Sequence, residues 1–129
     1  AALAARHAAP AQIRRMKAAL SAMERDRRRS VMPLENDRRF HLEIAEASGN
    51  SALALAVRTL WDQRTGPLFL RLEHHFDTPN LWAAAIAEHT AVMTAIEQHD
   101  LAGARAAMRR HMDEAARRFQ RSWSVESPR

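Results

Sequence analysis

The chain has 129 residues, enough for one compact domain, and 47% of them are hydrophobic, which argues against general disorder. It contains no cysteine, which excludes disulfides and thiolate metal sites, and no apolar run is long enough to span a membrane. The net charge of +5 comes from 20 basic and 15 acidic residues, but acids lie among the arginines, so we favour biased codon usage over a nucleic-acid surface.

Proline, glycine and the spacing of apolar residues predict the first two long helices. Pro10 is typical of a first helical turn, and apolar residues recur at helical spacing as far as about Arg28. Pro33 opens the next predicted helix, and Gly49 ends it as the residue after the C-cap. The chain begins without Met and in a helical pattern, so we expect it to be part of a longer protein.

The third long helix is predicted to begin after Asn50, whose side chain can cap it. We expect it to continue to about His75, with a kink at Pro67. Its apolar stripe consists of Leu53, Val57, Leu60, Trp61, Leu68 and Leu72.

Two more helices complete the predicted fold. Thr78 and Pro79 form a cap and first turn for a helix over residues 80–99, and Asp100 can cap the last helix, over residues 101–123. No strand-like alternation of useful length appears. The sequence therefore predicts an all-α fold, an antiparallel helical bundle of about six helices in one domain, residues 1–129.

Two histidines of these last helices are expected to face the core at the same height. His89 and His111 each fall within the apolar row of their helix. Each lies eleven residues from Asp100, which is at the turn between the helices. In an antiparallel hairpin both would lie about 16 Å from that turn, so their imidazoles can meet.

A second pair lies in the segment NDRRFHLEIAEASGN, where Asp37 and His41 share a helix face with the apolar Ile44. Three imidazoles and one carboxylate suit a divalent transition metal, with zinc or nickel first and manganese or iron next. A cation would also compensate the buried acid. The alternative is that each inward histidine is a hydrogen-bonded core residue and that Asp37 is a first-turn acid favoured by the helix dipole.

Arg64 is a further polar residue on a predicted apolar row, between Leu60 and Leu68. Its guanidinium could clamp a carboxylate with two hydrogen bonds, which makes it a candidate effector-binding residue. Alternatively, its stem covers apolar surface while the charged head reaches water.

Two segments, DRRFHLEIAEASGN and EHTAVMTAIEQHDLAGARAAMRRHM, resemble motifs of the FadR-type C-terminal ligand-binding domain (FCD) of GntR-superfamily bacterial transcription regulators. The resemblance spans roughly residues 36–119. It implies an all-α bundle of six or seven helices. It also implies that Asp37, His41, His89 and His111 hold a divalent ion that binds the carboxylate of a small organic acid.

The resemblance further implies a winged helix-turn-helix domain that binds operator DNA and is absent from this sequence. We therefore expect an effector-sensing domain of a transcription regulator, cytoplasmic and homodimeric, without catalytic residues or membrane contact. One alternative is a metal-dependent enzyme, a hydrolase or oxygenase in a helical bundle, because a metal with open positions can activate water. Another is a dimerising bundle without a ligand.

Overall fold

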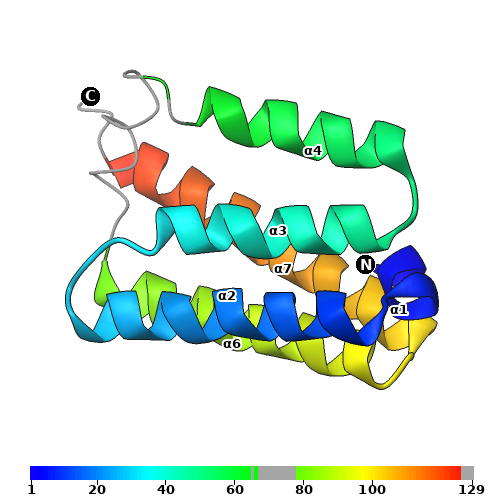
Figure 1. Ribbon diagram of the computed structural model, residues 1–129. Coiled ribbons are helices and arrows are strands. Elements are labelled where there is room, and N and C mark those ends of the chain that lie inside the picture. The colour runs from blue at the N-terminus through cyan, green and yellow to red at the C-terminus, as the bar shows by residue number, and fades with distance from the viewer. Residues whose placement is uncertain (65, 67–77, 126–129) are drawn as a thin grey trace.

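The computed structural model describes residues 1–64, 66 and 78–125, and all the regular secondary structure of these residues is helical (Figure 1). The all-α prediction is thus confirmed. Within the described residues no helix is both long and apolar enough to cross a bilayer. The helices are α1 (Ala2–His7), α2 (Pro10–Arg28), α3 (Leu34–Ala47), α4 (Ser51–Gln63), α6 (Pro79–Glu97) and α7 (Leu101–Val125).

Local signals set most of the helix ends, as predicted. Pro10 is the first residue of α2, and Gly49, just after α3, has a φ of +70°, which favours glycine. The side chains of Asn50, Thr78 and Asp100 each accept a hydrogen bond from the backbone N–H three residues later, at 3.0, 3.3 and 2.9 Å. These bonds satisfy donors that the first turn of a helix leaves without partners.

The predicted length of the third long helix is wrong, because α4 ends at Gln63 and Arg64 is its C-cap. Gly66 and Pro67 follow closely. Glycine favours a helix end, and the residue before a proline is disfavoured in the helical region, so the chain leaves the helix before it reaches Pro67. The rest of the predicted stretch, from Pro67 to His75, lies outside the described residues.

The helices share one hydrophobic core, to which α1, α2, α3, α6 and α7 contribute. The antiparallel α6 and α7 pack together most extensively, α2 packs on α3 and α6, and α1 contacts α3, α6 and α7 near one end (Figure 1). The core includes fully buried Met16, Met23, Phe40, Val92 and Ile96. This packing holds the inner faces of α3, α6 and α7 together, and each of them carries a buried polar residue.

The outermost helix, α4, packs mainly against α3. Trp61 is its one buried residue, whereas Leu53 and Leu60, which were expected to be buried, are 41% and 69% exposed. The apolar row of α4 therefore lies beside the core and not inside it, because among the described residues α4 has no second helix packed closely on that row.

Candidate metal centre

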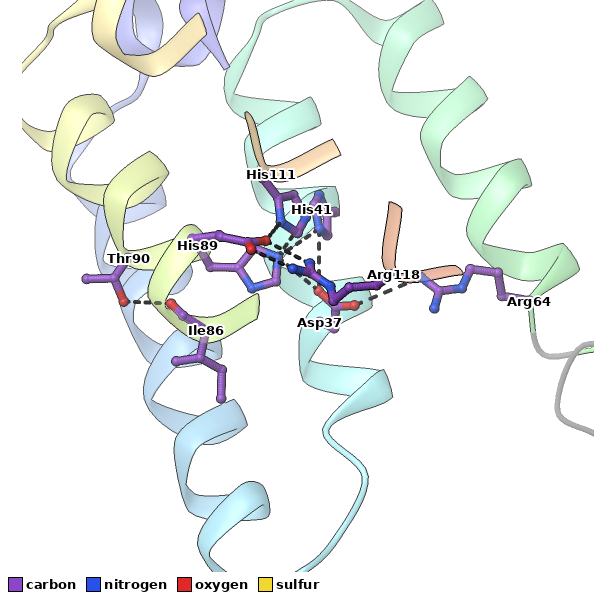
Figure 2. Close-up of polar contacts among 9 residues, drawn as sticks. Asp37, His41, Arg64, Ile86, His89, Thr90, His111 and Arg118 are labelled. Atoms are coloured by element: carbon purple, nitrogen blue, oxygen red, sulfur yellow. Dashed lines mark hydrogen bonds and ion pairs between the residues drawn. The ribbon is translucent and has the colours of Figure 1, made fainter. Parts of the chain in front are cut away.

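Three helices bring a carboxylate and three imidazoles to one place inside the bundle (Figure 2). Asp37 and His41 lie one turn apart on α3, His89 comes from the middle of α6 and His111 from the middle of α7. Asp37, His89 and His111 are 6%, 0% and 6% exposed. The Phe40 ring packs against the His89 ring at a centroid distance of 4.9 Å and helps to hold it in place.

The facing atoms of these side chains lie very close together. His89 Nε2 is 3.2 Å from His41 Nε2 and 3.1 Å from His111 Nε2. Asp37 Oδ1 lies 3.3 Å from His89 Nε2 and 3.4 Å from His41 Nε2. The structure thus brings together all four residues that the sequence singled out, and the equal distance of His89 and His111 from the turn does place their rings at one height.

The spacing of the imidazole nitrogens fits a shared cation. Two imidazole nitrogens that bind one ion at about 2.0–2.1 Å each lie about 3.0–3.4 Å apart, and the observed separations of 3.1 and 3.2 Å fall within that range. Hydrogen bonds account for the cluster only in part: His89 Nε2 lies within hydrogen-bond distance of the other two Nε2 atoms, but the buried Asp37 Oδ1 has no hydrogen-bond partner in the described part of the chain. A buried carboxylate oxygen without a donor is costly, and a cation beside it would remove that cost.

The protonation states are those that a metal ligand needs. Burial raises the pKa of Asp37, but the neighbouring imidazoles and the Arg64 guanidinium outweigh burial, so this pKa lies below its ordinary value. Burial lowers the pKa of His89 to about 3. Burial also lowers the pKa of His111, although its hydrogen bond with Glu88 opposes the shift. At neutral pH the site therefore presents an ionised Asp37 carboxylate and the neutral imidazoles of His89 and His111, the forms that bind metals.

Glu88 holds His111 from the side opposite the cluster. His111 Nδ1 donates a 2.8 Å hydrogen bond to Glu88 Oε2, which leaves Nε2 free of its proton and directed at the other imidazoles. Arg118, one turn beyond Glu114 on α7, donates two hydrogen bonds to the same carboxylate, at 2.6 and 2.8 Å. Burial tends to raise the pKa of Glu88, but Arg118 and His111 lower it overall and keep it ionised.

Arg64 reaches the edge of the same cluster from the end of α4. Its Nη1 atom is 3.9 Å from Asp37 Oδ2, and its guanidinium lies over the Trp61 ring, 4.1 Å from the ring centroid. Trp61 in turn contacts the His41 ring at a centroid distance of 5.5 Å. The expectation that Arg64 points inward therefore agrees with its position, although it lies just beyond the helix on which it was predicted.

A cavity of about 630 Å³ adjoins the cluster and is lined by residues of α3, α4, α6 and α7. Asp37, the three clustered histidines and Arg64 all line it, so a small molecule inside could reach them. This volume is typical of small-molecule sites, which range over about 300–1,000 Å³.

Sequence reasoning missed two polar residues of the site, Glu88 and Arg118. Glu88 directly precedes His89 in the sequence, and no inward role was predicted for it. A signal for Arg118 was present, because it follows His111 by seven residues, which is two helical turns and thus the same side of α7. Glu43, which is two residues after His41 in the sequence, instead pairs with Arg15 at 2.8 Å.

Comparisons with known proteins show the family to which the chain is similar. A family model described as the FCD domain matches residues 1–114. The Uxu operon transcriptional regulator of Escherichia coli K12 is 31% identical over 108 residues, which cover 81% of this chain and 42% of that protein. The Exu regulon transcriptional regulator of the same organism is 34% identical over 82 residues, covering 61% of this chain and 31% of that protein. The chain thus spans less than half the length of the curated relatives it matches.

Proposed function

This chain belongs to the FCD domain family, and on that premise we propose that it is the sensing domain of a bacterial transcription regulator of the GntR type. We infer that it binds a divalent transition metal ion and a small carboxylate effector, which together control a DNA-binding domain elsewhere in the regulator. Both relatives described above are named as transcription regulators, which points to a regulator and not to an enzyme.

The observation that carries this proposal is the convergence of one carboxylate and three imidazole nitrogens at the wall of a cavity. Asp37, His41, His89 and His111 would hold the ion. A nitrogen-rich set with one carboxylate favours zinc or nickel, with manganese or iron as further candidates. A divalent cation there would supply positive charge and open coordination positions for a carboxylate oxygen.

Residues beside the cluster have supporting roles in this proposal. Arg64 is the second anchor of the effector carboxylate, because it lines the cavity and its guanidinium lies close to Asp37. Glu88 positions His111 through the Nδ1 hydrogen bond. Trp61 supports the Arg64 guanidinium through its ring face.

The origin of the ligands on three helices suggests how the signal is transmitted. An effector that bound preferentially to one arrangement of α3, α6 and α7 would stabilise that arrangement. We propose that residues 1–129 act as one sensing domain, that a homodimer is the working form, and that operator DNA is bound by a separate domain of the full regulator.

Elemental analysis of protein purified without added metal tests the site. We expect about one equivalent of zinc or nickel per chain, and we expect the double variant Asp37→Asn with His89→Gln to lose it while keeping a helical circular dichroism spectrum. His7→Gln, a change of an exposed histidine on α1, serves as the control and should retain the metal. Unchanged metal content in the double variant would refute the proposed ligands.

Effector binding is tested separately through Arg64→Gln. This variant should retain the metal and bind carboxylates at least tenfold more weakly, because it loses a charged donor beside the ligand oxygen. Full binding of carboxylates by Arg64→Gln would remove this residue from the site without affecting the metal ligands.

A further inference from the structure

The wall of the cavity is chemically divided, with its charged groups collected at one end. Among the described lining residues, the charged side chains besides the histidines are Asp37, Arg64 and Arg118, and all three lie around the metal cluster (Figure 2). The charge of Arg118 is matched by Glu88 through two hydrogen bonds. This end can therefore hold one carboxylate, between the ion and Arg64.

The rest of the described wall is apolar. No hydroxyl or amide side chain lines the cavity within the described residues, and outside the charged end the side chains of the described wall offer, apart from methionine sulfur, only the indole N–H of Trp82 as a polar group. The apolar part of the wall includes Leu53, Val57, Leu60, Trp82, Met108 and Phe119.

The exposure of α4 supports an apolar occupant. Leu60 and Leu53 line the cavity, yet they are 69% and 41% exposed, so a row of leucine side chains borders an open space. Apolar surface that borders a cavity is stabilised when an apolar group covers it.

Resting on the function proposed above, we propose that the effector is a monocarboxylate with a hydrocarbon or aromatic body. Its carboxylate lies at the metal and Arg64, and its body lies along the apolar faces of α4 and α7. A hydroxyl-rich acid is disfavoured, because its hydroxyl groups would lose water without finding hydrogen-bond partners among the described side chains of the apolar part of the wall.

Calorimetric titration of the metal-loaded chain tests the proposal with a homologous series of acids: acetate, butanoate, hexanoate and octanoate. Because each methylene leaves water on binding, affinity should rise roughly three- to fourfold per added CH₂ until the cavity is filled. 3-Phenylpropanoate should bind at least tenfold more tightly than acetate. D-Gluconate, a hydroxyl-rich acid of similar length to hexanoate, should bind at least tenfold more weakly than hexanoate.

The outcomes separate this inference from the proposed function. If the metal-loaded protein binds gluconate as tightly as hexanoate, or if the affinity does not change along the series, the inference of an apolar effector is overturned. The proposal that the domain senses a carboxylate then still stands. Protein that holds the metal but binds none of these acids overturns both.

Two leucines of α4 provide a matched pair of variants. Leu60→Gln changes an exposed residue on the cavity wall, and Leu55→Gln changes a residue that is 64% exposed on the same helix but does not line the cavity. Leu60→Gln should weaken octanoate binding three- to tenfold and leave acetate binding unchanged, whereas Leu55→Gln should leave both unchanged. Equal effects of the two variants on octanoate would contradict the proposed position of its hydrocarbon body.

Discussion

His111 Nδ1–H donates a 2.8 Å hydrogen bond to Glu88 Oε2, and the same carboxylate accepts two hydrogen bonds from Arg118. The contact determines which ring nitrogen of His111 is available to the cluster. It also joins a proposed metal ligand to a cation on the cavity wall, so a change at Glu88 should affect both.

Removing this contact should weaken metal binding. Glu88→Ala should raise the dissociation constant of the metal about 10- to 100-fold, because the His111 ring loses the acceptor that orients it. Glu88→Gln should retain part of the affinity, since its amide oxygen can still accept a hydrogen bond from His111 Nδ1–H. Competition with a chromogenic chelator measures the constants.

Glu43→Ala is the matched control for Glu88→Ala. It removes an acid whose side-chain partner among the described residues is Arg15 on α2, away from the cluster. It should leave the metal affinity unchanged, and equal losses in Glu43→Ala and Glu88→Ala would contradict a specific role of Glu88.

Metal binding should stabilise the fold. At free metal a hundredfold above its dissociation constant, linkage adds about 2.7 kcal/mol, which is on the order of 10 °C in melting temperature for a domain of this size. Thermal unfolding with zinc or nickel and with excess chelator measures the difference. His41→Gln should abolish the difference and His7→Gln should not; a melting temperature independent of metal would be inconsistent with the site.

Stability of the chelator-treated protein should fall as pH falls below about 6.5. The ordinary pKa of histidine is 6.5, whereas that of folded His89 is about 3, so between these values the unfolded chain binds a proton that the folded chain does not. Stability is then lost toward acid pH, by up to about 1.4 kcal/mol per pH unit for one group. Burial lowers the pKa of His111 as well, and this acts in the same direction.

Urea unfolding at a series of pH values measures this slope. His89→Gln has no titrating ring at this position, so its slope between pH 6.5 and 4 should be smaller than that of the parent chain. The same slope in both proteins would show that His89 is not the group responsible.

Replacing Gly49 should destabilise the fold for conformational reasons alone. Its φ is +70°, and a Cβ atom there would meet nothing within 4 Å, so the cost of Gly49→Ala is that of the left-handed backbone, about 1–2 kcal/mol. Ser30, with a φ of +56°, presents the opposite case, and Ser30→Gly should not destabilise the chain and should raise its melting temperature slightly. Thermal unfolding measures both variants: Gly49→Ala should melt at a lower temperature than the parent chain, and Ser30→Gly slightly above it. Equal melting temperatures of the two variants would contradict the role of the left-handed backbone at these positions.

The exposed apolar row of α4 shows that hydrophobic periodicity alone does not predict whether a helix face is buried. Leu53, Val57 and Leu60 have the spacing of a buried helix face, but spacing indicates which residues share a face and not what covers that face. In the structure the row borders a cavity, and Leu60 is largely exposed. The helix ends at Gln63 and does not continue as predicted for a different reason, because the Gly66–Pro67 pair that follows disfavours helical backbone despite the apolar periodicity.

The sequence by itself determined the helical class, most helix ends and the inward faces of Asp37, His89 and His111. These features depend on capping, proline and glycine geometry and helical periodicity, which act over a few residues, and on a hairpin whose turn lies midway between His89 and His111. Only the tertiary structure decided that Glu88 and Arg118 support the cluster and that an apolar cavity adjoins it. Such contacts depend on how whole helices pack, because a rotation or shift of one helix moves every side chain on its surface.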